Sequence, residues 1–197
     1  GFSGLGMAIA LKREGKADFI VLERANDVGG TWRDNVYPGA ACDIPSHLYS
    51  YSFRPNPYWT SVYSTQPEIH AYLQGAARDE RVTEHVAFNN DVTDARWNET
   101  DRLWEVKTQQ GLWRGRALVS ASGHLSDPVL PEIAGIDGYK GALFHSARWD
   151  SNHDFKGQKV AVIGTGASAI QIVPELAKVA GSLTVFQRTA PYIVPRR

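Results

Sequence analysis

The sequence has almost no cysteine and no excess of charge of either sign. Cys42 is the only cysteine among 197 residues, which excludes an intrachain disulfide and favours a reducing compartment. The 21 basic residues balance the 21 acidic ones without a run of one sign, so no nucleic-acid partner is expected. No stretch approaches the roughly 18 apolar residues of a membrane span. We therefore expect a cytoplasmic protein that acts on small molecules and holds no metal.

Two glycine-rich turns are present, and a charged residue follows each of them at the same distance. Glu23 lies 19 residues after Gly4, the end of the first turn, and Arg188 lies 19 residues after Ala169, the end of the second. About 20 residues separate the turn from the ribose-reading residue of a Rossmann unit. A carboxylate there accepts hydrogen bonds from a free ribose diol, whereas a guanidinium suits a 2′-phosphate. The pair predicts one FAD-type site and one NADP-type site.

The hydrophobic pattern predicts the α/β fold class, with two Rossmann-like dinucleotide-binding domains and a small β-meander in the first. In the first domain we expect a helix over 4–14 that stops at Gly15, a strand over 18–23, and a helix over 66–80 with one apolar face formed by Ile69, Tyr72, Leu73 and Ala76. Further strands are expected at 82–88, 91–97, 103–108 and 113–119. The second domain is expected to contain a strand at 159–163, a helix at 167–180 and a strand at 183–187.

Breaks in this pattern suggest where the domains begin and end. We expect an FAD-binding domain over 1–125, a linker over 126–158 and the start of an NADP-binding domain over 159–197. The chain begins inside the first turn, without the strand that should precede it. We therefore expect a fragment in which both domains are incomplete. The segment 24–63 shows little periodicity but many aromatic residues, which favours a functional loop.

Three short motifs carry a resemblance to a known family. Gly29-Gly30-Thr31-Trp32, Tyr37-Pro38-Gly39 and Asp43 match the pattern [A/G]-G-x-W-x-x-x-x-[F/Y]-P-[G/M]-x-x-x-D. Gly141, His145 and Trp149-Asp150 match F-x-G-x-x-x-H-x-x-x-W-[P/D], with Tyr139 in place of the usual Phe. Ala121-Ser122-Gly123 is similar to a connector motif that precedes the NADP domain. Together they resemble the type I Baeyer-Villiger monooxygenases, a branch of the flavin-containing monooxygenase superfamily.

The resemblance implies an activity. In that family NADPH reduces bound FAD, and one atom of O₂ is then inserted into a ketone to give an ester or a lactone, while the other becomes water. The implied cofactors are FAD and NADP, and the implied partners are a ketone or sulfide substrate and O₂. The arginine that the family uses over the flavin corresponds to no residue of this sequence.

Site residues are assigned by position within the matched motifs. The FAD contacts are expected from Gly1, Ser3, Gly4, Glu23, Arg24, Gly30, Thr31, Trp32, Asp43, Tyr49 and Val92. The NADP contacts are expected from Gly164, Thr165, Gly166, Ala167, Ser168, Ala169, Arg188 and Thr189. Asp43 is the candidate catalytic residue, near the family's arginine. Gly141, His145 and Trp149 form the linker fingerprint, in which we expect a structural role for His145.

Other interpretations of the same residues stay open at this point. Trp32 and Tyr37 could form a small apolar cluster, Tyr49 could belong to the core, and Arg188 could be a solvated cation after a strand. Oxygenation at N or S is the nearest alternative chemistry, and an inactive nucleotide-binding fragment is an alternative of a different class. A disulfide reductase is disfavoured because Cys42 has no partner cysteine.

Overall fold

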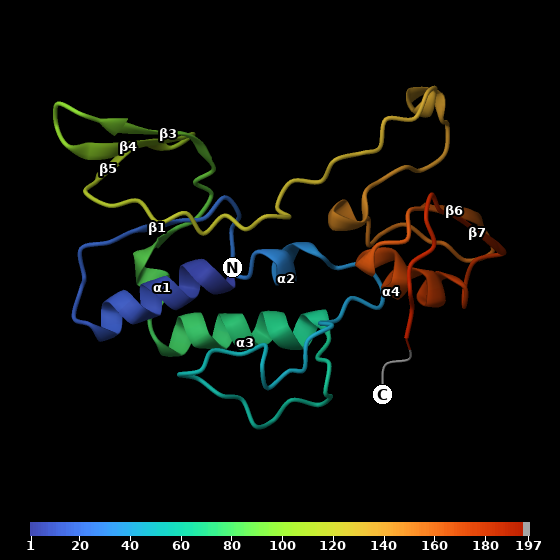
Figure 1. Cartoon of the computed structure of the whole chain (residues 1–197), viewed down its shortest axis with the longest axis horizontal. Helices are drawn as coiled ribbons and strands as arrows, with labels where there is room; N and C mark the ends of the chain where they lie inside the picture. The colour runs from blue at the N-terminus through green and yellow to red at the C-terminus, as the bar shows by residue number, and fades with distance from the viewer. Residues whose placement is uncertain (195–197) are drawn as a thin grey trace. The chain divides into compact units, whose positions relative to one another are not determined.

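The computed structural model describes residues 1–194 of the chain and divides them into two compact units. The first unit contains residues 1–33, 51–55 and 67–126, and the second contains 34–50, 56–66 and 127–194. Figure 1 labels the α-helices and most of the strands of both units. The linear domain boundaries given above stay a prediction, and each unit is described here by itself.

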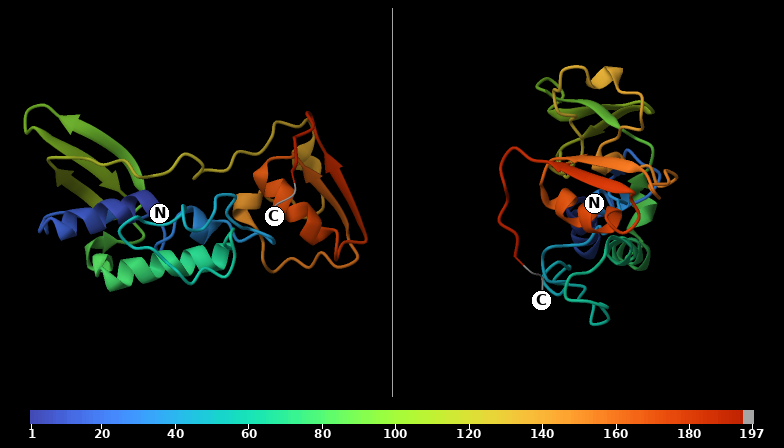
Figure 2. Two further views of the ribbon diagram at one scale, coloured as in Figure 1. Left: turned by 60° about the horizontal axis from the view of Figure 1, so that its bottom comes forward. Right: turned by 90° about the vertical axis from the view of Figure 1, so that its right-hand side faces the viewer.

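Two helices provide most of the core of the first unit. Helix α1 spans Phe2–Arg13 and helix α3 spans Gln66–Asp79, and the two lie side by side in Figures 1 and 2. The expected helices are confirmed, and Gly15 follows α1 with a positive φ of 71°, which suits a glycine that stops a helix. The apolar face expected on α3 is fully or nearly buried; it consists of Ile69, Tyr72, Leu73 and Ala76. Three residues of α1 are buried as well: Leu5, Ala8 and Ile9.

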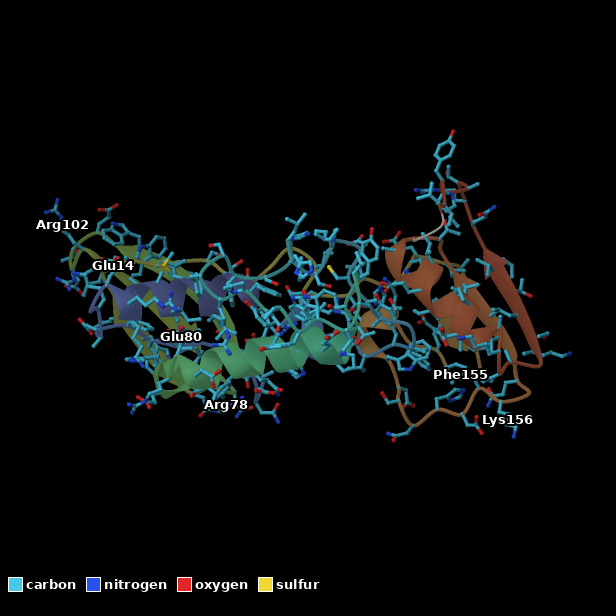
Figure 3. All side chains as sticks on the ribbon, turned by 90° about the horizontal axis from the view of Figure 1, so that it is seen from below. Glu14, Arg78, Glu80, Arg102, Phe155 and Lys156 are labelled. Atoms are coloured by element: carbon cyan, nitrogen blue, oxygen red, sulfur yellow. The ribbon has the colours of Figure 1, made fainter. Side chains whose placement is uncertain are left out.

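Polar contacts fasten other segments to these helices. The Tyr72 hydroxyl donates to the Arg54 carbonyl at 2.7 Å and accepts from the Tyr51 amide at 2.9 Å, which fixes segment 51–55 on α3. Burial raises the pKa of Tyr72 above its ordinary value. Arg13 of α1 donates to both carboxylate oxygens of Glu80, which is labelled in Figure 3, at 2.5 and 3.3 Å. The hydrogen bond from Arg13 lowers the pKa of Glu80.

The two strands of the small parallel sheet in this unit are shorter than predicted. β1 spans only Val21–Leu22 and pairs in parallel with β2, Val86–Ala87. The strand expected over 82–88 is wrong for its first half, because Val82–His85 forms the 3₁₀ helix η1. Arg81 adopts a left-handed φ of 53° immediately before it, which breaks the extended backbone and allows Val82 to be completely buried.

The predicted meander is present with three antiparallel strands. β3 spans Val92–Asn98, β4 spans Leu103–Thr108 and β5 spans Gly111–Gly115. Their order is β3-β4-β5, and the register places Val106 opposite Ala95 and Trp113. The strand expected at 82–88 therefore does not belong to this meander. β5 also lies earlier than the predicted 113–119, because Gly111 already pairs with Thr108.

The second unit contains a strand–helix–strand segment. β6 spans Lys159–Ile163, helix α4 spans Ala167–Leu176 and β7 spans Ser182–Phe186. β6 and β7 pair in parallel, and α4 covers one face of the pair (Figure 2), with Ile172 and Leu176 buried. This is the predicted βαβ arrangement. The helix ends four residues earlier than expected, since the Lys178 amide turns back to the Glu175 carbonyl at 3.3 Å.

Three short helices lie in the connecting segments: α2 at Thr31–Asp34, η2 at Ile136–Gly138 and η3 at Ser146–Arg148. Among the described residues, no helix has the length and apolar character needed to cross a membrane. Within residues 1–194, no group of three or more His, Cys, Asp or Glu side chains could hold a metal ion.

Candidate dinucleotide-binding sites

The first glycine-rich turn is tightly enclosed by backbone. Gly1 is the N-cap of α1, and no side chain caps that end of the helix. A Cβ built on Gly30, which has a φ of 55°, would lie only 2.9 Å from the Gly1 Cα. The two chain segments can therefore approach this closely because Gly30 has no side chain, whereas a Cβ on Gly1 would make an ordinary contact with the Gly30 Cα at 3.7 Å. Ser3 is exposed in the first turn of the helix, and a Cβ built on Gly4 would lie 3.7 Å from the Ala121 Cβ.

The acid that follows this turn is held by an ion pair. Glu23 comes directly after β1, and its amide and carbonyl bond to the Ala87 carbonyl and the Asn90 amide. Its Oε1 lies 2.9 Å from an Arg33 nitrogen and accepts the Ala25 amide at 3.1 Å. The side chains of Glu23 and Arg33 are only 16% and 12% exposed, so the charge of each is balanced mainly by the other.

The same arginine joins a network that the sequence did not reveal. Arg33 Nη1 also donates to the Asp27 carbonyl at 2.7 Å. The Asp27 carboxylate accepts from Gln74 at 2.7 Å and lies 3.5 Å from His70 Nε2. His70 in turn stands against Gly29, where a Cβ would be 2.7 Å from the imidazole ring. Arg33, Asp27, His70 and Gln74 thus fix the backbone around the Gly29-Gly30 pair.

Four other predicted FAD contacts also belong to this unit. Arg24 follows Glu23 and donates to the Ser126 carbonyl at 2.8 Å. Thr31 is exposed at the start of α2, Trp32 beside it is buried, and Val92 is exposed at the start of β3. Their roles toward FAD stay predictions.

The second glycine-rich turn is open. Gly164 has a φ of 107°, and a Cβ on Gly164 or Gly166 would meet no atom within 4 Å. Gly166 is the N-cap of α4, without a side-chain cap, so the helix begins at Ala167 with its amides facing this space. Ser168 and Ala169 follow in the first turn and are half-buried. A dinucleotide pyrophosphate suits such a helix end, because backbone amides and the helix dipole both favour an anion.

The basic residue that follows this turn, Arg188, lies at the same sheet edge. β6 and β7 end at Ile163 and Phe186, which are paired, and the Gly164 amide bonds to the Phe186 carbonyl at 2.9 Å. Arg188 follows two residues later and is exposed. Within residues 1–194, no carboxylate lies within ion-pair distance of Arg188. Thr189 contributes its carbonyl to a 3.3 Å hydrogen bond from the Thr165 hydroxyl, which ties the two segments together.

The segment that carries Asp43 belongs to the second unit. Ala41 forms an antiparallel bridge with Thr65, and the Cys42 amide bonds to the Ser64 carbonyl at 2.9 Å. Asp43 follows directly and is exposed. Tyr49 is half-buried, and its amide bonds to the Pro45 carbonyl. The structure therefore places Asp43 in an exposed position directly after a hydrogen-bonded backbone segment, and its role toward a ligand stays a prediction.

The linker fingerprint forms a local cluster. His145 Nδ1 accepts the Ala147 amide at 3.0 Å and so caps η3. Trp149 contacts Phe144 edge-on at 5.2 Å and stacks on Phe155 at 5.1 Å between ring centroids, and Phe155 is labelled in Figure 3. Gly141 leaves no room for a Cβ beside the Tyr139 ring. These contacts are structural ones, and they favour the structural role expected of His145.

Both units thus present a glycine-rich turn at the start of a helix and a charged residue after a parallel strand. Such features define a protein that binds dinucleotides. The model of the family described as pyridine nucleotide-disulphide oxidoreductase matches residues 1–194, and the chain belongs to that family. Cys42 is nevertheless its only cysteine, so no cysteine pair within this sequence could exchange with a disulfide.

Relatives with assigned names are similar over the whole chain. The chain is 53% identical over 196 residues to a protein of Streptomyces coelicolor named Baeyer-Villiger monooxygenase, covering all of this chain and 38% of the relative. A protein of the same name from Pseudomonas aeruginosa is 48% identical over 197 residues, with 100% and 37% covered. The expected resemblance to Baeyer-Villiger monooxygenases is confirmed. The chain spans little more than a third of the length of these relatives.

Solved structures are similar as well. The crystal structure of OTEMO in complex with FAD and NADP matches with a TM-score of 0.90 and 41% identity, over 96% of this chain and 37% of that one. Cyclohexanone monooxygenase from Rhodococcus sp. Phi1 bound to NADP⁺ matches with a TM-score of 0.92 and 38% identity, over 99% and 38%. The expected α/β fold class is thereby confirmed.

Proposed function

We propose that the full-length protein is a monooxygenase that uses FAD, NADPH and O₂ to convert a ketone into an ester or lactone. One observation carries the proposal: two glycine-rich turns stand before helices, one followed by an enclosed carboxylate and the other by an exposed guanidinium. These are the complementary groups for a free ribose and for a phosphorylated one. The relatives named Baeyer-Villiger monooxygenase support the same chemistry.

The residues of the first turn fit an FAD pyrophosphate and ribose. Gly1 and Gly30 keep side chains away from the start of α1, so an anionic group can reach the helix amides. Glu23 has one oxygen engaged by Arg33 and the Ala25 amide, so its other oxygen can accept hydrogen bonds from the ribose hydroxyls. Bound FAD, reduced by NADPH, supplies the chemistry of O₂ activation.

The residues of the second turn fit NADPH. The open space beside Gly164 and Gly166 allows the pyrophosphate to reach the amino end of α4. Arg188, exposed at the same sheet edge, has donors for a 2′-phosphate, and a charge-assisted pair of this kind is stronger than a neutral hydrogen bond. The protein is therefore expected to prefer NADPH over NADH.

The chain's own contribution to the oxygen transfer centres on Asp43. It is exposed, but the backbone on its N-terminal side is fixed by the bridge from Ala41 to Thr65. A carboxylate held in this way can orient a cationic group of the site, and that cation can stabilise the negative charge that develops during oxygen transfer. The substrate we propose is a small-molecule ketone, with a sulfide as an alternative. The location we propose is the cytoplasm, which the low cysteine content of this sequence supports.

The decisive experiment incubates the full-length protein with a panel of ketones and sulfides, NADPH and ¹⁸O₂. We expect one labelled oxygen atom in an ester or lactone and consumption of one NADPH for each product molecule. Labelled sulfoxides without any ester would instead assign the protein to heteroatom oxygenation. Unchanged substrates together with a flavin that NADPH never reduces would contradict the proposal.

A further inference from the structure

The side chain of Gln171 joins helix α4 to the segment that carries Asp43. Its Nε2 donates to the Ala41 carbonyl at 2.8 Å, and its Oε1 accepts the Tyr37 hydroxyl at 3.0 Å. The Ala41 amide makes a longer contact to the same Oε1, at 3.4 Å. One amide group thus engages both backbone polar groups of Ala41, which is 130 residues away in the sequence.

The backbone comes close to the helix at a second point of the same segment. Gly39 has a φ of 80°, and a Cβ placed on it would lie 2.6 Å from the Gln171 carbonyl oxygen. Only a glycine meets both conditions, because other residues rarely adopt this φ and would collide with the helix backbone. Segment 37–42 therefore lies directly on the middle of α4.

The contact lies between two groups that the proposed function requires. Gln171 is five residues from the N-cap Gly166, which is about 7.5 Å along the helix axis. On the other side, Ala41 is two residues from Asp43, and the intervening Cys42 is buried with its amide bonded to Ser64. A short and continuous set of bonded groups thus connects the amino end of α4 with Asp43.

We infer that Gln171 is a positioning residue that transmits binding of NADP at the amino end of α4 to the Asp43 segment. The inference rests on the proposed function, since it takes the second turn to be the NADP site. A ligand that orders the first turns of α4 restricts the motion of Gln171, and its amide then restricts Ala41 and the residues that follow. Gln171 itself needs no contact with the cofactor.

Hydrogen exchange of the full-length FAD-bound protein tests this step directly. In the wild type, saturating NADP⁺ should slow amide exchange across residues 37–44 by about fivefold or more. In Gln171→Met, which keeps the length of the side chain but loses the amide, this protection should vanish while the Kd for NADP⁺ changes by less than about threefold. Steady-state kinetics of Gln171→Met should likewise show a lower kcat with a nearly unchanged KM for NADPH, because the catalytic step is affected and nucleotide binding is not.

Two controls separate this role from a general loss of structure. Gln158→Met makes the same substitution in the same unit, at a residue that bonds to His153 and Asp154 instead, and should leave the NADP⁺-dependent protection intact. Gln171→Glu keeps the acceptor for Tyr37 but loses the donor to Ala41, and should behave like Gln171→Met. Persistent protection of 37–44 in Gln171→Met, or its absence in the wild type with NADP⁺ bound, would overturn the inference. Failure of the wild type to bind NADP⁺ would instead count against the proposed function.

Discussion

The two glycine-rich turns differ in how closely other parts of the chain surround them, and in whether the charged residue that follows already has a partner in the protein. Around the first turn, Gly1 and Gly30 are in close contact and Glu23 is already neutralised by Arg33. Around the second turn, Gly166 faces open space and Arg188 is exposed. A neutral ribose diol brings no charge, so a carboxylate that reads it needs a protein cation as counterion. A phosphate carries a negative charge and is itself the counterion of the arginine that binds it, so this arginine can be solvent-exposed before the ligand binds.

The largest expected effect comes from adding one methyl group to each turn of the full-length protein. Gly30→Ala forces a left-handed residue against the Gly1 backbone, so we expect a loss of FAD affinity of more than about 100-fold. Gly166→Ala, with a φ of −69°, should keep its flavin and lose only about tenfold in NADPH affinity. The absorbance ratio of flavin to protein and a titration with NADP⁺ measure the two effects. Normal flavin content in Gly30→Ala would show that the first turn accepts an added methyl group as readily as the second, and would contradict the difference described above.

The next effect concerns the exposed arginine. Arg188→Ala should weaken NADPH by roughly 30- to 100-fold and NADH by less than about threefold, because only NADPH carries the 2′-phosphate. KM values and stopped-flow rates of flavin reduction with both nucleotides provide the measurement. Arg148→Ala is a suitable control, as it removes another exposed arginine of the second unit. Equal losses for the two nucleotides would show that Arg188 does not read the phosphate.

A smaller effect is expected from the enclosed ion pair. Arg33→Met leaves the Glu23 carboxylate without its cation, and the free energy of unfolding should fall by about 2 kcal/mol. Urea denaturation of the FAD-free full-length protein provides the measurement. Glu23→Gln in the Arg33→Met background should recover part of this loss, since the unpaired charge is then gone. A double variant that is less stable than both single variants would contradict a charge-balancing role.

The smallest effect comes from the ion pair between Arg13 and Glu80, whose side chains are 46% and 22% exposed, respectively. Glu80→Gln should lower Tm by about 1–2 °C at pH 7. The folded-state pKa of Glu80 lies below its ordinary value of 4.5, so this stabilisation is present above that value and is lost as the pH falls through the folded pKa. Calorimetry over a pH series should therefore show a difference in Tm between wild type and variant at pH 7 that shrinks below pH 4.5 and is lost once the pH has fallen through the folded-state pKa. A difference that persists in acid would mean that the ion pair is not its source.

The sequence predicted the regular elements best where the apolar pattern was dense. The buried face of α3 follows from local periodicity alone. The same signal located β3 and β4, whereas β5 begins two residues before the predicted strand. The 3₁₀ turn at Val82–His85 did not, because it depends on the left-handed backbone at Arg81, a residue type that carries no such signal.

The contacts around the candidate sites were harder to predict than the sites themselves. Glu23 and Arg188 could be placed because their distance from a glycine-rich turn is a repeated feature of Rossmann units. Arg33 occupies a variable position of its motif, and Gln171 contacts Ala41 across 130 residues of sequence. Only the folded backbone brings those partners together, so no local pattern could have identified them.

The burial of Cys42 gives the chain a built-in reporter. Its side chain is 3% exposed, and its sulfur accepts the Ile44 amide at 3.4 Å, immediately beside Asp43. A thiol in this environment reacts with an alkylating reagent only when the surrounding backbone opens. The alkylation rate of Cys42, followed in its own peptide by mass spectrometry, therefore measures how often the backbone around Asp43 opens, without any engineered label.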